Sequence, residues 1–425
     1  MNRPAFDALI GSIEAVAGHR FTQALRHHPL SDDIVLRLAT PEEVRRVVVP
    51  VRRDSGALEM LTAWRVCHSR ALGPSKGGVR FAADVSESQL LALAFRIMLK
   101  CAVNGLPHGG AGGGVVVAPH TLSRTEREQV ARRYVDALGA AVAVDRDILS
   151  PDLGTDAETM AWMADQHTKA IGDYPAGAIN GKPVALGGIP GRPGATARGA
   201  WIVLDQVLRA VEVRPKGLTF AIQGYGSAGG HLAVLLERQG LRLVAAADGS
   251  GALSNPAGLN AAALWAHKQA GGRFSDLQMA AARHGAAVDV LTADADILIP
   301  AATDNQITAG LASRLSARFV LEIANGPVAS DAEPVLASRG ITVIPDLVAN
   351  AGGITMSHFE WRQNREGARW TEADARERLD ARMADTSRAL IDAATRHAVP
   401  LAVAAQLLAI DRLERVLQSS LATLN

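Results

Sequence analysis

The sequence predicts an α/β protein of two domains, followed by C-terminal helices. The chain has 425 residues, which suggests two domains of about 150–200 residues each. A strand, a glycine turn, a helix and a second strand follow one another over residues 218–248, as in a βαβ unit. Short apolar runs then recur, as expected for a continuing parallel sheet. They lie at 289–291 (weak), 296–300, 319–322 and 341–345.

Composition narrows the classes of function. Lys and Arg number 44 against 43 Asp and Glu, so charge predicts no nucleic-acid partner. The longest apolar runs end well short of the roughly 20 residues that span a membrane. Asp7 and Glu14 interrupt the N-terminal apolar pattern, unlike in a signal peptide. Cys67 and Cys101 are too few for a disulfide framework, so we expect a reducing, cytoplasmic setting, with no membrane partner and no metal site.

We assign residues 1–185 to the first domain, on the period of their apolar residues and on their turn signals. We expect, in order, helices over 6–17 and around 22–27, strands over 43–50 and 57–65, a turn and strand over 73–81, a helix over 87–103, a short buried strand over 115–117, a helix over 123–143 with Ser123 and Glu126 as a capping box, a loop over 146–156 after a buried strand, and a helix over 162–170.

A Gly- and Pro-rich stretch, 181–199, predicts a hinge into a second domain over 186–350. There we expect a helix over 200–213, a strand over 218–223, a helix over 230–239 and a strand over 241–248. The remaining residues, 351–425, are expected to return as helices to the cleft between the domains, with a break near Pro400.

The stretch from Lys100 to Val117 contains five glycines and Ala111 within residues 109–114. Each glycine carries an entropic cost in a regular element, so we expect a loop here rather than a helix or an ordinary strand. Such a loop lets the backbone approach a ligand closely. We place it at the floor of an active site.

A second glycine motif follows the strand at 218–223 and opens the next helix. It comprises Gly224, Tyr225, Gly226, Ser227, Ala228 and Gly229, and the following strand ends at Asp248. This context is the dinucleotide-binding fingerprint, in which a pyrophosphate meets the helix N-terminus. Asp248 would accept hydrogen bonds from a ribose diol and repel a 2′-phosphate, which favours NAD. NADP is the alternative, because Gly249 and Ser250 leave room for a phosphate. The alternative interpretation of the motif is a glycine turn with a purely structural role.

Other polar residues are ambiguous on their own. Lys76 and Lys100 lie in glycine-rich or apolar sequence and require an anionic partner or a lowered pKa. They could bind a substrate with two carboxylates, or pair within the protein. Asp152 is either a proton carrier or the N-cap of the next helix. Asn325 and Asn350 lie beside glycines after predicted strands, where contacts to a ligand and ordinary turns are both common.

Together these motifs resemble the glutamate/leucine/phenylalanine/valine dehydrogenase family, and its glutamate dehydrogenase branch in particular. The similarity runs from about Leu72 to Asn364. Its blocks are GPSKGGVRF, the helix ending in Lys100, LPHGG, SPDLGTD, GKPVALGG with Gly191-Arg192 and Ala195-Thr196, GYGSAG, ANGP and PDLVANAGGITMSHFEWRQN.

The resemblance implies a substrate domain and a Rossmann-type dinucleotide domain that together oxidatively deaminate a 2-amino acid to a 2-oxo acid and ammonia. Lys76 and Ser357 resemble the pair that binds the side-chain carboxylate of glutamate, and Lys100 the residue that binds the α-carboxylate. Asp152 resembles the aspartate that moves protons to and from the amino group. The residues that resemble cofactor contacts are Thr196, Asn325 and Asn350. A hexamer assembled through the substrate domains is also implied.

One residue departs from the family pattern. Gly112 stands where the family's GGAKGG loop carries a lysine that activates water and stabilises the carbinolamine. Normal glutamate turnover is therefore expected to be impaired. The alternatives are a reductase of a preformed imine or of another 2-oxo-acid-derived substrate, a non-catalytic regulatory subunit, or an engineered inactivation. His108 is a weak candidate to replace the lysine.

Overall fold

The structure is a computed structural model that describes residues 19–172, 177–279 and 281–421. It divides into two compact units, which are described separately. Unit 1 comprises the residues up to Arg192, Ile354–Arg376 and the residues from Leu407 on, and unit 2 comprises Pro193–Gly353 and Glu377–Gln406. The helix predicted over 6–17 lies outside the described residues.

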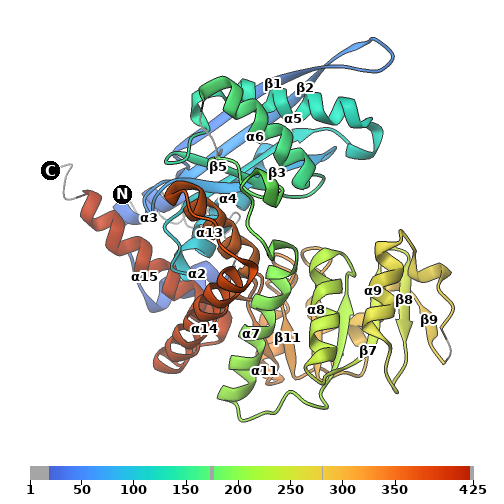
Figure 1. The fold of residues 1–425 in the computed structure, drawn as a ribbon. Helices are drawn as coiled ribbons and strands as arrows, with labels where there is room; N and C mark the ends of the chain where they lie inside the picture. Colours follow the sequence, from blue (N-terminus) through green and yellow to red (C-terminus); the bar gives the residue numbers. More distant parts are fainter. Residues whose placement is uncertain (1–18, 173–176, 280, 422–425) are drawn as a thin grey trace. The chain divides into compact units, whose positions relative to one another are not determined.

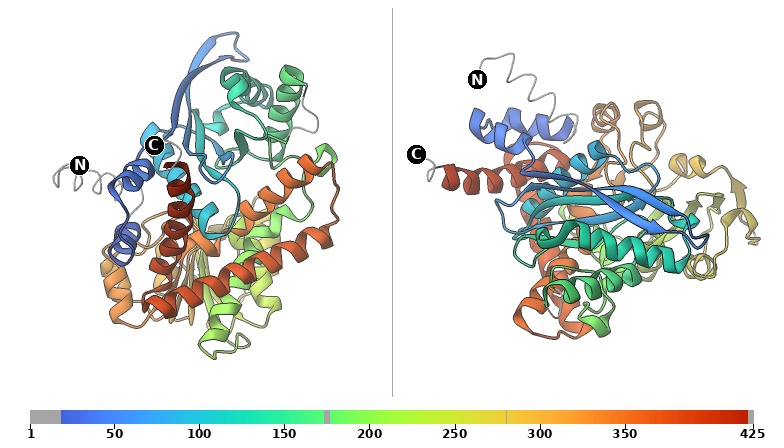
Figure 2. Two further views of the ribbon diagram at one scale, coloured as in Figure 1. Left: turned by 90° about the vertical axis from the view of Figure 1, so that its left-hand side faces the viewer. Right: turned by 90° about the horizontal axis from the view of Figure 1, so that it is seen from above.

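Unit 1 is built on a five-stranded mixed sheet of order β1-β2-β4-β3-β5. Its strands are β1 (Glu43–Arg52), β2 (Leu58–Ser69), β3 (Ser75–Ala82), β4 (Gly109–Val116) and β5 (Asp147–Pro151). Its helices include α2 (His19–His27), α3 (Asp32–Ala39), α4 (Glu87–Val103), α5 (Arg124–Leu138) and α6 (Ala157–Ile171). The long antiparallel hairpin of β1 and β2 forms one edge, and β4, β3 and β5 run parallel to one another (Figures 1 and 2).

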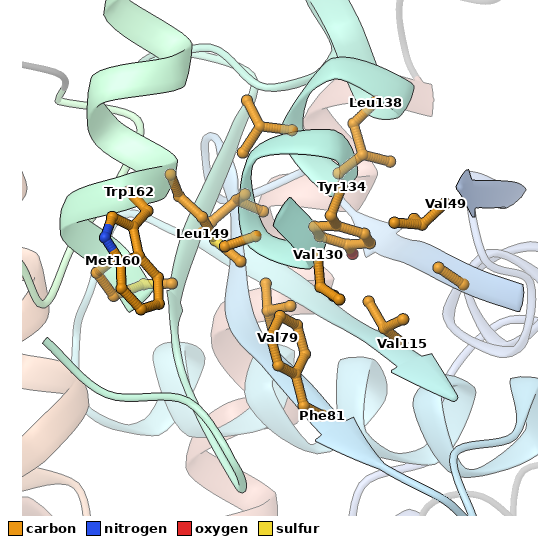
Figure 3. Packing of buried hydrophobic residues seen from close by; sticks show 14 of the residues in the cluster. Val49, Val79, Phe81, Val115, Val130, Tyr134, Leu138, Leu149, Met160 and Trp162 are labelled. Atoms are coloured by element: carbon orange, nitrogen blue, oxygen red, sulfur yellow. The ribbon is translucent and has the colours of Figure 1, made fainter. Parts of the chain in front are cut away.

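Helices cover both faces of this sheet. On one face, α5 and α6 pack against alternate residues of the strands, where Tyr134 and Met160 meet Val79 and Phe81 in a fully buried cluster (Figure 3). On the other face lies α4, whose Leu90 and other apolar residues pack against β2 and the end of β3. The helix predicted over 87–103 is confirmed, and so is the Ser123–Glu126 capping box of α5.

The composition of the glycine-rich stretch predicts a loop, and this prediction is wrong. The stretch forms the buried strand β4. The reason is close approach of backbone and side chains on both sides. A Cβ on Gly109 would lie 1.7 Å from the Ser69 carbonyl oxygen, and one on Gly110 would lie 2.0 Å from the Ala94 carbonyl oxygen of α4. The glycines let β4 fit between β2, β3 and α4, and these contacts outweigh their entropic cost.

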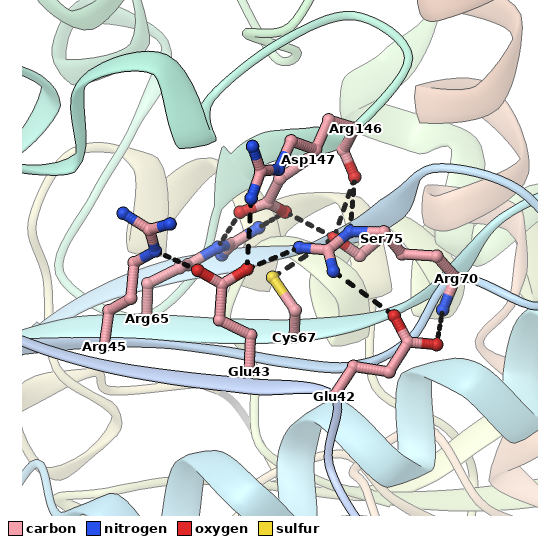
Figure 4. Close-up of polar contacts among 9 residues, drawn as sticks. All are labelled: Glu42, Glu43, Arg45, Arg65, Cys67, Arg70, Ser75, Arg146 and Asp147. Atoms are coloured by element: carbon pink, nitrogen blue, oxygen red, sulfur yellow. Dashed lines mark hydrogen bonds and ion pairs between the residues drawn. The ribbon is translucent and has the colours of Figure 1, made fainter.

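A buried ion pair joins three strands of unit 1 (Figure 4). Arg65 on β2 donates Nε–H and Nη2–H to the two carboxylate oxygens of Asp147 on β5, at 2.8 and 2.6 Å. Ser75 on β3 donates its hydroxyl to the same carboxylate at 2.9 Å. Burial alone would lower the pKa of Arg65, but the charge of Asp147 raises it above its ordinary value. Arg65 also donates to the carbonyl oxygens of Gly77 and Gly78, each at 3.3 Å, and so holds this part of β3 in place.

The loop predicted over 146–156 is partly wrong, because β5 itself occupies residues 147–151. Its last residue, Pro151, pairs with Val79 of β3. Asp152 therefore follows the strand directly, at its carboxyl end.

Unit 2 contains a seven-stranded sheet of order β12-β11-β10-β6-β7-β8-β9. Its strands are β6 (Thr219–Gln223), β7 (Arg242–Asp248), β8 (Gly251–Ser254), β9 (Arg283–Gly285), β10 (Ile297–Pro300), β11 (Phe319–Leu321) and β12 (Thr342–Ile344). Its helices include α7 (Ala195–Ala210), α8 (Ser227–Arg238), α9 (Ala261–Gln269), α10 (Ala309–Ala312), α11 (Glu333–Ser338) and α12 (Asp346–Ala349). Figure 1 shows α7, α8 and α9 side by side on one face.

The parallel part of this sheet, from β12 to β7, is as the sequence predicts. Two features differ. The weak apolar run at 289–291 lies in a 3₁₀ helix, Ala287–Thr292, rather than a strand. Two antiparallel strands, β8 and β9, extend the sheet beyond β7. Both are very short, and their sequences lack the apolar alternation that would predict them.

The C-terminal part forms α13 (Gly352–Glu366), α14 (Glu372–His397) and α15 (Leu401–Leu421). The break between α14 and α15 falls at the predicted Pro400. From Ile354 on, α13 belongs to unit 1, as does α15 from Leu407 on. Among the helices of the described residues, none is by itself long and apolar enough to cross a membrane, and only the bent pair of α14 and α15 meets these criteria jointly.

Candidate active site

Three polar side chains meet inside unit 1. Two of them, Lys76 and Ser357, are predicted from the sequence, and the third, Asn180, is not. Lys76 on β3 donates from Nζ to the amide oxygen of Asn180 at 2.5 Å. Ser357 on α13 donates its hydroxyl to the same oxygen at 3.4 Å. All three side chains are buried. The structure therefore brings Lys76 and Ser357 together, although 281 residues separate them in the sequence.

The surroundings of Lys76 are rich in cations. Burial is the main cause that lowers its pKa to about 7, and the positive charge of Arg192 lowers it further. The carboxylate of Glu360 opposes this effect and raises the pKa of Lys76. Glu360 already pairs with Lys182 at 3.0 Å and accepts the Gly181 N–H at 2.9 Å. A site with more cations than carboxylates is suited to receive an anion.

Lys100 lies in the last turn of α4 and is buried. The positive charges of both lysines act on the neighbouring Cys101. Burial raises the pKa of the Cys101 thiol to about 12, against the opposing charges of Lys76 and Lys100. Unit 1 therefore contains two buried lysines, Lys76 on β3 and Lys100 on α4.

Gly112 faces α4, on the same side of β4 as Gly110, which pairs with Lys76 of the neighbouring strand. A Cβ on Gly112 would lie 3.0 Å from the Leu90 carbonyl oxygen and 3.4 Å from the Leu93 side chain. This contact is tight, but it needs only a few tenths of an ångström of movement. By contrast, a Cβ on Gly110 would overlap the backbone of α4. Position 112 can therefore hold a side chain that position 110 cannot.

Asp152 follows β5 and forms an ion pair with Arg80 of β3, with 2.7 Å between Oδ2 and Nε. Its other oxygen accepts the Leu153 N–H at 2.8 Å. About a quarter of its side chain is exposed, so it is accessible to solvent. The alternative that it caps the next helix is wrong, because Asp156 is the N-cap of α6.

His108 has a different environment from Gly112. Its Nε2 lies 2.9 Å from Nδ1 of His358, and its ring contacts Trp361, both on α13. Burial is the main cause that lowers its pKa well below the ordinary value. Four residues of strand separate it from Gly112, which is about 13 Å. These contacts give no support to His108 as a replacement for a lysine at position 112.

In unit 2, each glycine of the predicted fingerprint has a distinct role. Gly224 has φ +95° and lies against the Ala301 backbone, as the tight turn after β6 requires. A Cβ on Gly229 would lie 2.0 Å from the Gly224 carbonyl oxygen, so this glycine permits the helix to pack on the turn. Gly226 is the N-cap of α8, without a side-chain cap, and a Cβ there would meet open space. This open N-terminus fits the pyrophosphate of a dinucleotide.

Asp248 ends β7 and lies, as expected, at the carboxyl edge of the sheet. Burial raises its pKa, but hydrogen bonds from Lys268 and Ser250 outweigh this and lower the pKa to about 2. The sequence gives no signal for Lys268, which lies on α9. It lies 20 residues from Asp248, and nothing in the local pattern pairs the two.

The remaining predicted cofactor contacts also lie in unit 2. Asn350 donates its amide to the Ile323 carbonyl oxygen at 3.0 Å and to Asn325 Oδ1 at 3.2 Å, so the two asparagines are neighbours. Thr196 lies at the start of α7. Its hydroxyl is close to Gly353, because a Cβ added to Gly353 would lie 2.9 Å from that oxygen. Among the described residues, no cluster of three or more His, Cys, Asp or Glu side chains could hold a metal ion.

The sequence interpretation missed Asn180, and also the roles of Lys182 and Glu360. Asn180 follows Gly177, Ala178 and Ile179 and precedes Gly181, in a glycine-flanked stretch typical of a turn, so no signal distinguishes it. Glu360 lies three residues after Ser357 on α13, and this helical spacing could have placed it on the same face.

Comparisons with known proteins identify the family of the chain. A model of the Glu/Leu/Phe/Val dehydrogenase dimerisation domain matches residues 41–169, and one of the Glutamate/Leucine/Phenylalanine/Valine dehydrogenase domain matches residues 187–420. The NADP-specific glutamate dehydrogenase of a Synechocystis species is 36% identical over 97% of this chain and 98% of its own length. The catabolic NAD-specific glutamate dehydrogenase of Bacillus subtilis is 36% identical over 91% of each chain.

A solved structure of a hetero-hexameric glutamate dehydrogenase from Thermus thermophilus, in a leucine-bound form, superposes with a TM-score of 0.90. It is 33% identical and covers 99% of this chain and 98% of its own. The two domain models and the relatives together span nearly the whole sequence. The chain therefore belongs to the glutamate/leucine/phenylalanine/valine dehydrogenase family of NAD(P)-linked oxidoreductases that act on CH–NH₂ groups.

Proposed function

We propose that the chain binds glutamate or 2-oxoglutarate in unit 1 and a nicotinamide dinucleotide in unit 2, and that its turnover is impaired because position 112 lacks a lysine. In this proposal, residues 1–185 bind substrate and assemble the oligomer, and 186–350 bind the cofactor. Within residues 351–425, α13 supplies Ser357 to unit 1, and the part of α15 from Leu407 on also belongs to that unit. The observation that carries the proposal is the buried group of Lys76, Asn180 and Ser357.

The substrate preference follows from charge. Lys76 is buried with Ser357 beside a shared amide, so it offers a desolvated cation and a hydroxyl to a side-chain carboxylate. We assign the α-carboxylate to Lys100, which is buried in the last turn of α4. An aliphatic side chain in place of a carboxylate would leave Lys76 without an anion in a buried site, which is unfavourable. We therefore favour a dicarboxylic substrate over leucine, valine or phenylalanine.

The chemistry divides among few groups. A bound nicotinamide would supply hydride transfer, which the protein does not perform itself. Asp152 is accessible at the end of β5 and would carry a proton to or from the amino group. Gly112 contributes no acid, base or charge. Loss of one positioned acid–base group typically lowers the rate by about 10²–10⁴-fold, and loss of a charge beside a developing oxyanion lowers it further.

The test is Gly112→Lys, with Gly112→Met as the matched control of similar length and no charge. Oxidation of NADH and NADPH is followed with 2-oxoglutarate and ammonia. We expect the lysine variant to exceed the parent by at least about 100-fold and the methionine variant to stay at the parent level. A parent that already turns over at about 10 s⁻¹, the median for enzymes, would contradict the proposed impairment.

A second candidate function is a non-catalytic subunit of a mixed hexamer. Two observations favour it: Gly112, and the likeness to a hetero-hexameric glutamate dehydrogenase. The test mixes the purified chain with an active family member from the same organism. A mixed hexamer by native mass spectrometry, with altered turnover per active subunit, would support this role. Separate homo-hexamers with unchanged turnover would rule it out.

A further inference from the structure

The carboxylate of Asp248 is already fully used within unit 2. Its Oδ1 accepts the Ser250 N–H at 2.8 Å and the Ser250 hydroxyl at 2.5 Å. Its Oδ2 accepts Lys268 Nζ at 2.5 Å and the Phe274 N–H at 3.2 Å. An ionised carboxylate has about four lone-pair sites. Asp248 therefore has no free acceptor site for the two hydroxyls of a ribose.

The charge of Asp248 is also compensated. Lys268 is held in place by a second hydrogen bond, to the Gly272 carbonyl oxygen at 2.8 Å, and its ammonium lies 5.6 Å from the Phe274 ring centroid. An ammonium has three donors, so one remains after these two bonds. The usual argument that an aspartate at this position repels a 2′-phosphate does not hold when a lysine neutralises it.

Beside this pair lies an open cavity of about 320 Å³, lined by Asp248, Gly249, Ser250, Lys268 and Arg273. Its lining has two cationic side chains and one carboxylate, and that carboxylate is paired with Lys268. The side chain of Arg273 belongs to an exposed residue. The cavity thus has a net positive charge and a planar guanidinium, which suits a phosphate group.

The position of the cavity matters as much as its charge. It lies at the carboxyl end of β7, one strand away from β6 and the open N-terminus of α8 at Gly226. In a dinucleotide-binding fold, the α8 N-terminus meets the pyrophosphate and the end of the second strand meets the adenosine ribose. A phosphate carried on that ribose would enter the cavity.

We propose that Lys268 and Arg273 bind the 2′-phosphate of NADP(H), so that this chain prefers NADP(H) to NAD(H). This inference rests on the proposed cofactor site in unit 2 and departs from the preference for NAD that Asp248 suggests in the sequence. Asp248 positions Lys268 rather than binding the ribose. The matched relatives include both NADP-specific and NAD-specific enzymes, so the family alone leaves the choice open.

The test measures binding, because turnover is expected to be low. Isothermal titration of the full chain compares NADPH with NADH, and adenosine 2′,5′-bisphosphate with adenosine 5′-monophosphate. We expect each 2′-phosphorylated compound to bind at least tenfold more tightly than its partner, and the ratio to fall as NaCl is raised. Lys268→Ala and Arg273→Ala should each reduce the ratio by about tenfold. Lys216→Ala, an exposed residue before β6, is the control and should leave the ratio unchanged.

The outcomes separate the inference from the proposed function. Equal or tighter binding of NADH would overturn the inference and leave the proposed cofactor site standing. An unchanged ratio in Arg273→Ala, which alters an exposed side chain, together with an unchanged ratio in Lys268→Ala, would also overturn it. Failure of both dinucleotides to bind, with glutarate still bound by unit 1, would refute the cofactor site itself.

Discussion

Replacing Gly110 and Gly112 by alanine, one at a time, tests whether the glycines of β4 serve the fold or mark a lost catalytic group. The two positions share a strand, a face and a neighbouring helix, so each is a control for the other. A Cβ at Gly110 would lie 2.0 Å from the Ala94 carbonyl oxygen and 2.5 Å from the Met98 nitrogen. Both atoms belong to the backbone of α4, so the whole helix would have to move by more than an ångström.

The magnitudes differ accordingly. Overpacking of this kind costs about 1–3 kcal/mol, and a displaced helix places Gly110→Ala at the upper end. At Gly112 the closest atom is 3.0 Å away, so little movement is needed. Alanine also reduces the entropy of the unfolded chain, which stabilises by about 0.4–1 kcal/mol and offsets the strain. We therefore expect the free energies of unfolding of the two variants to differ by about 2–3 kcal/mol.

Differential scanning calorimetry measures this difference. For a domain of about 150–250 residues, 1 kcal/mol shifts Tm by about 2–4 °C. Gly110→Ala should therefore melt about 5–10 °C below Gly112→Ala, and the latter should remain within about 2 °C of the parent. Equal melting of the two variants would refute the reasoning, because it would mean that α4 does not rest on the Gly110 backbone.

Two further predictions concern buried charges in unit 1. Asp147→Asn should lower the free energy of unfolding by about 3–5 kcal/mol, because Arg65 keeps its charge in a buried site without a counter-ion. Urea unfolding measures this loss, and the double change Arg65→Met with Asp147→Leu should recover most of it. A loss under about 1 kcal/mol in Asp147→Asn would contradict the argument. The pKa of Lys76 is about 7 in the folded chain against an ordinary 10.5. Between these values the unfolded chain binds more protons, so the stability that Lys76 contributes rises with pH from about 7 to 10.5. The rise between pH 7 and 9 should be smaller in Lys76→Met, and identical slopes for the two proteins would show that Lys76 is not desolvated.

Local sequence patterns predicted those elements whose conformation is determined by interactions between residues close together in the sequence. The helix 87–103 has one broad apolar face, and the capping box of α5 lies within four residues, so neither needs distant information. β4 could not be predicted in this way. Its glycines are unfavourable in a strand taken alone, and they become necessary only through contacts with distant residues, such as the backbones of β2 and α4 and the Tyr134 side chain.

The same distinction applies to the site. Lys76 and Lys100 could be singled out because charged residues in apolar or glycine-rich sequence require a partner, and Asp248 because it ends the strand that follows the GYGSAG motif. The residues that pair with them in the folded chain could not be predicted in this way. Asn180 lies 104 residues from Lys76, and Lys268 lies 20 residues from Asp248, and each pair meets only after the chain has folded. For Asp248 the partner changes the expected preference, because a carboxylate paired with lysine recognises ligands differently from a free one.

The contact between Gly110 and α4 also has a mechanical consequence. Most helices rest on a sheet through a layer of side chains, which can change rotamer and so let the helix slide or tilt slightly. Here part of that compliant layer is missing, because backbone atoms of β4 and α4 meet directly at Gly110. The helix α4, which carries Lys100 in its last turn, is therefore stiffly coupled to β4, the strand that pairs with Lys76. The two lysines should therefore move together, and in the proposed substrate site this would fix the spacing of the two cations that we assign to the carboxylates.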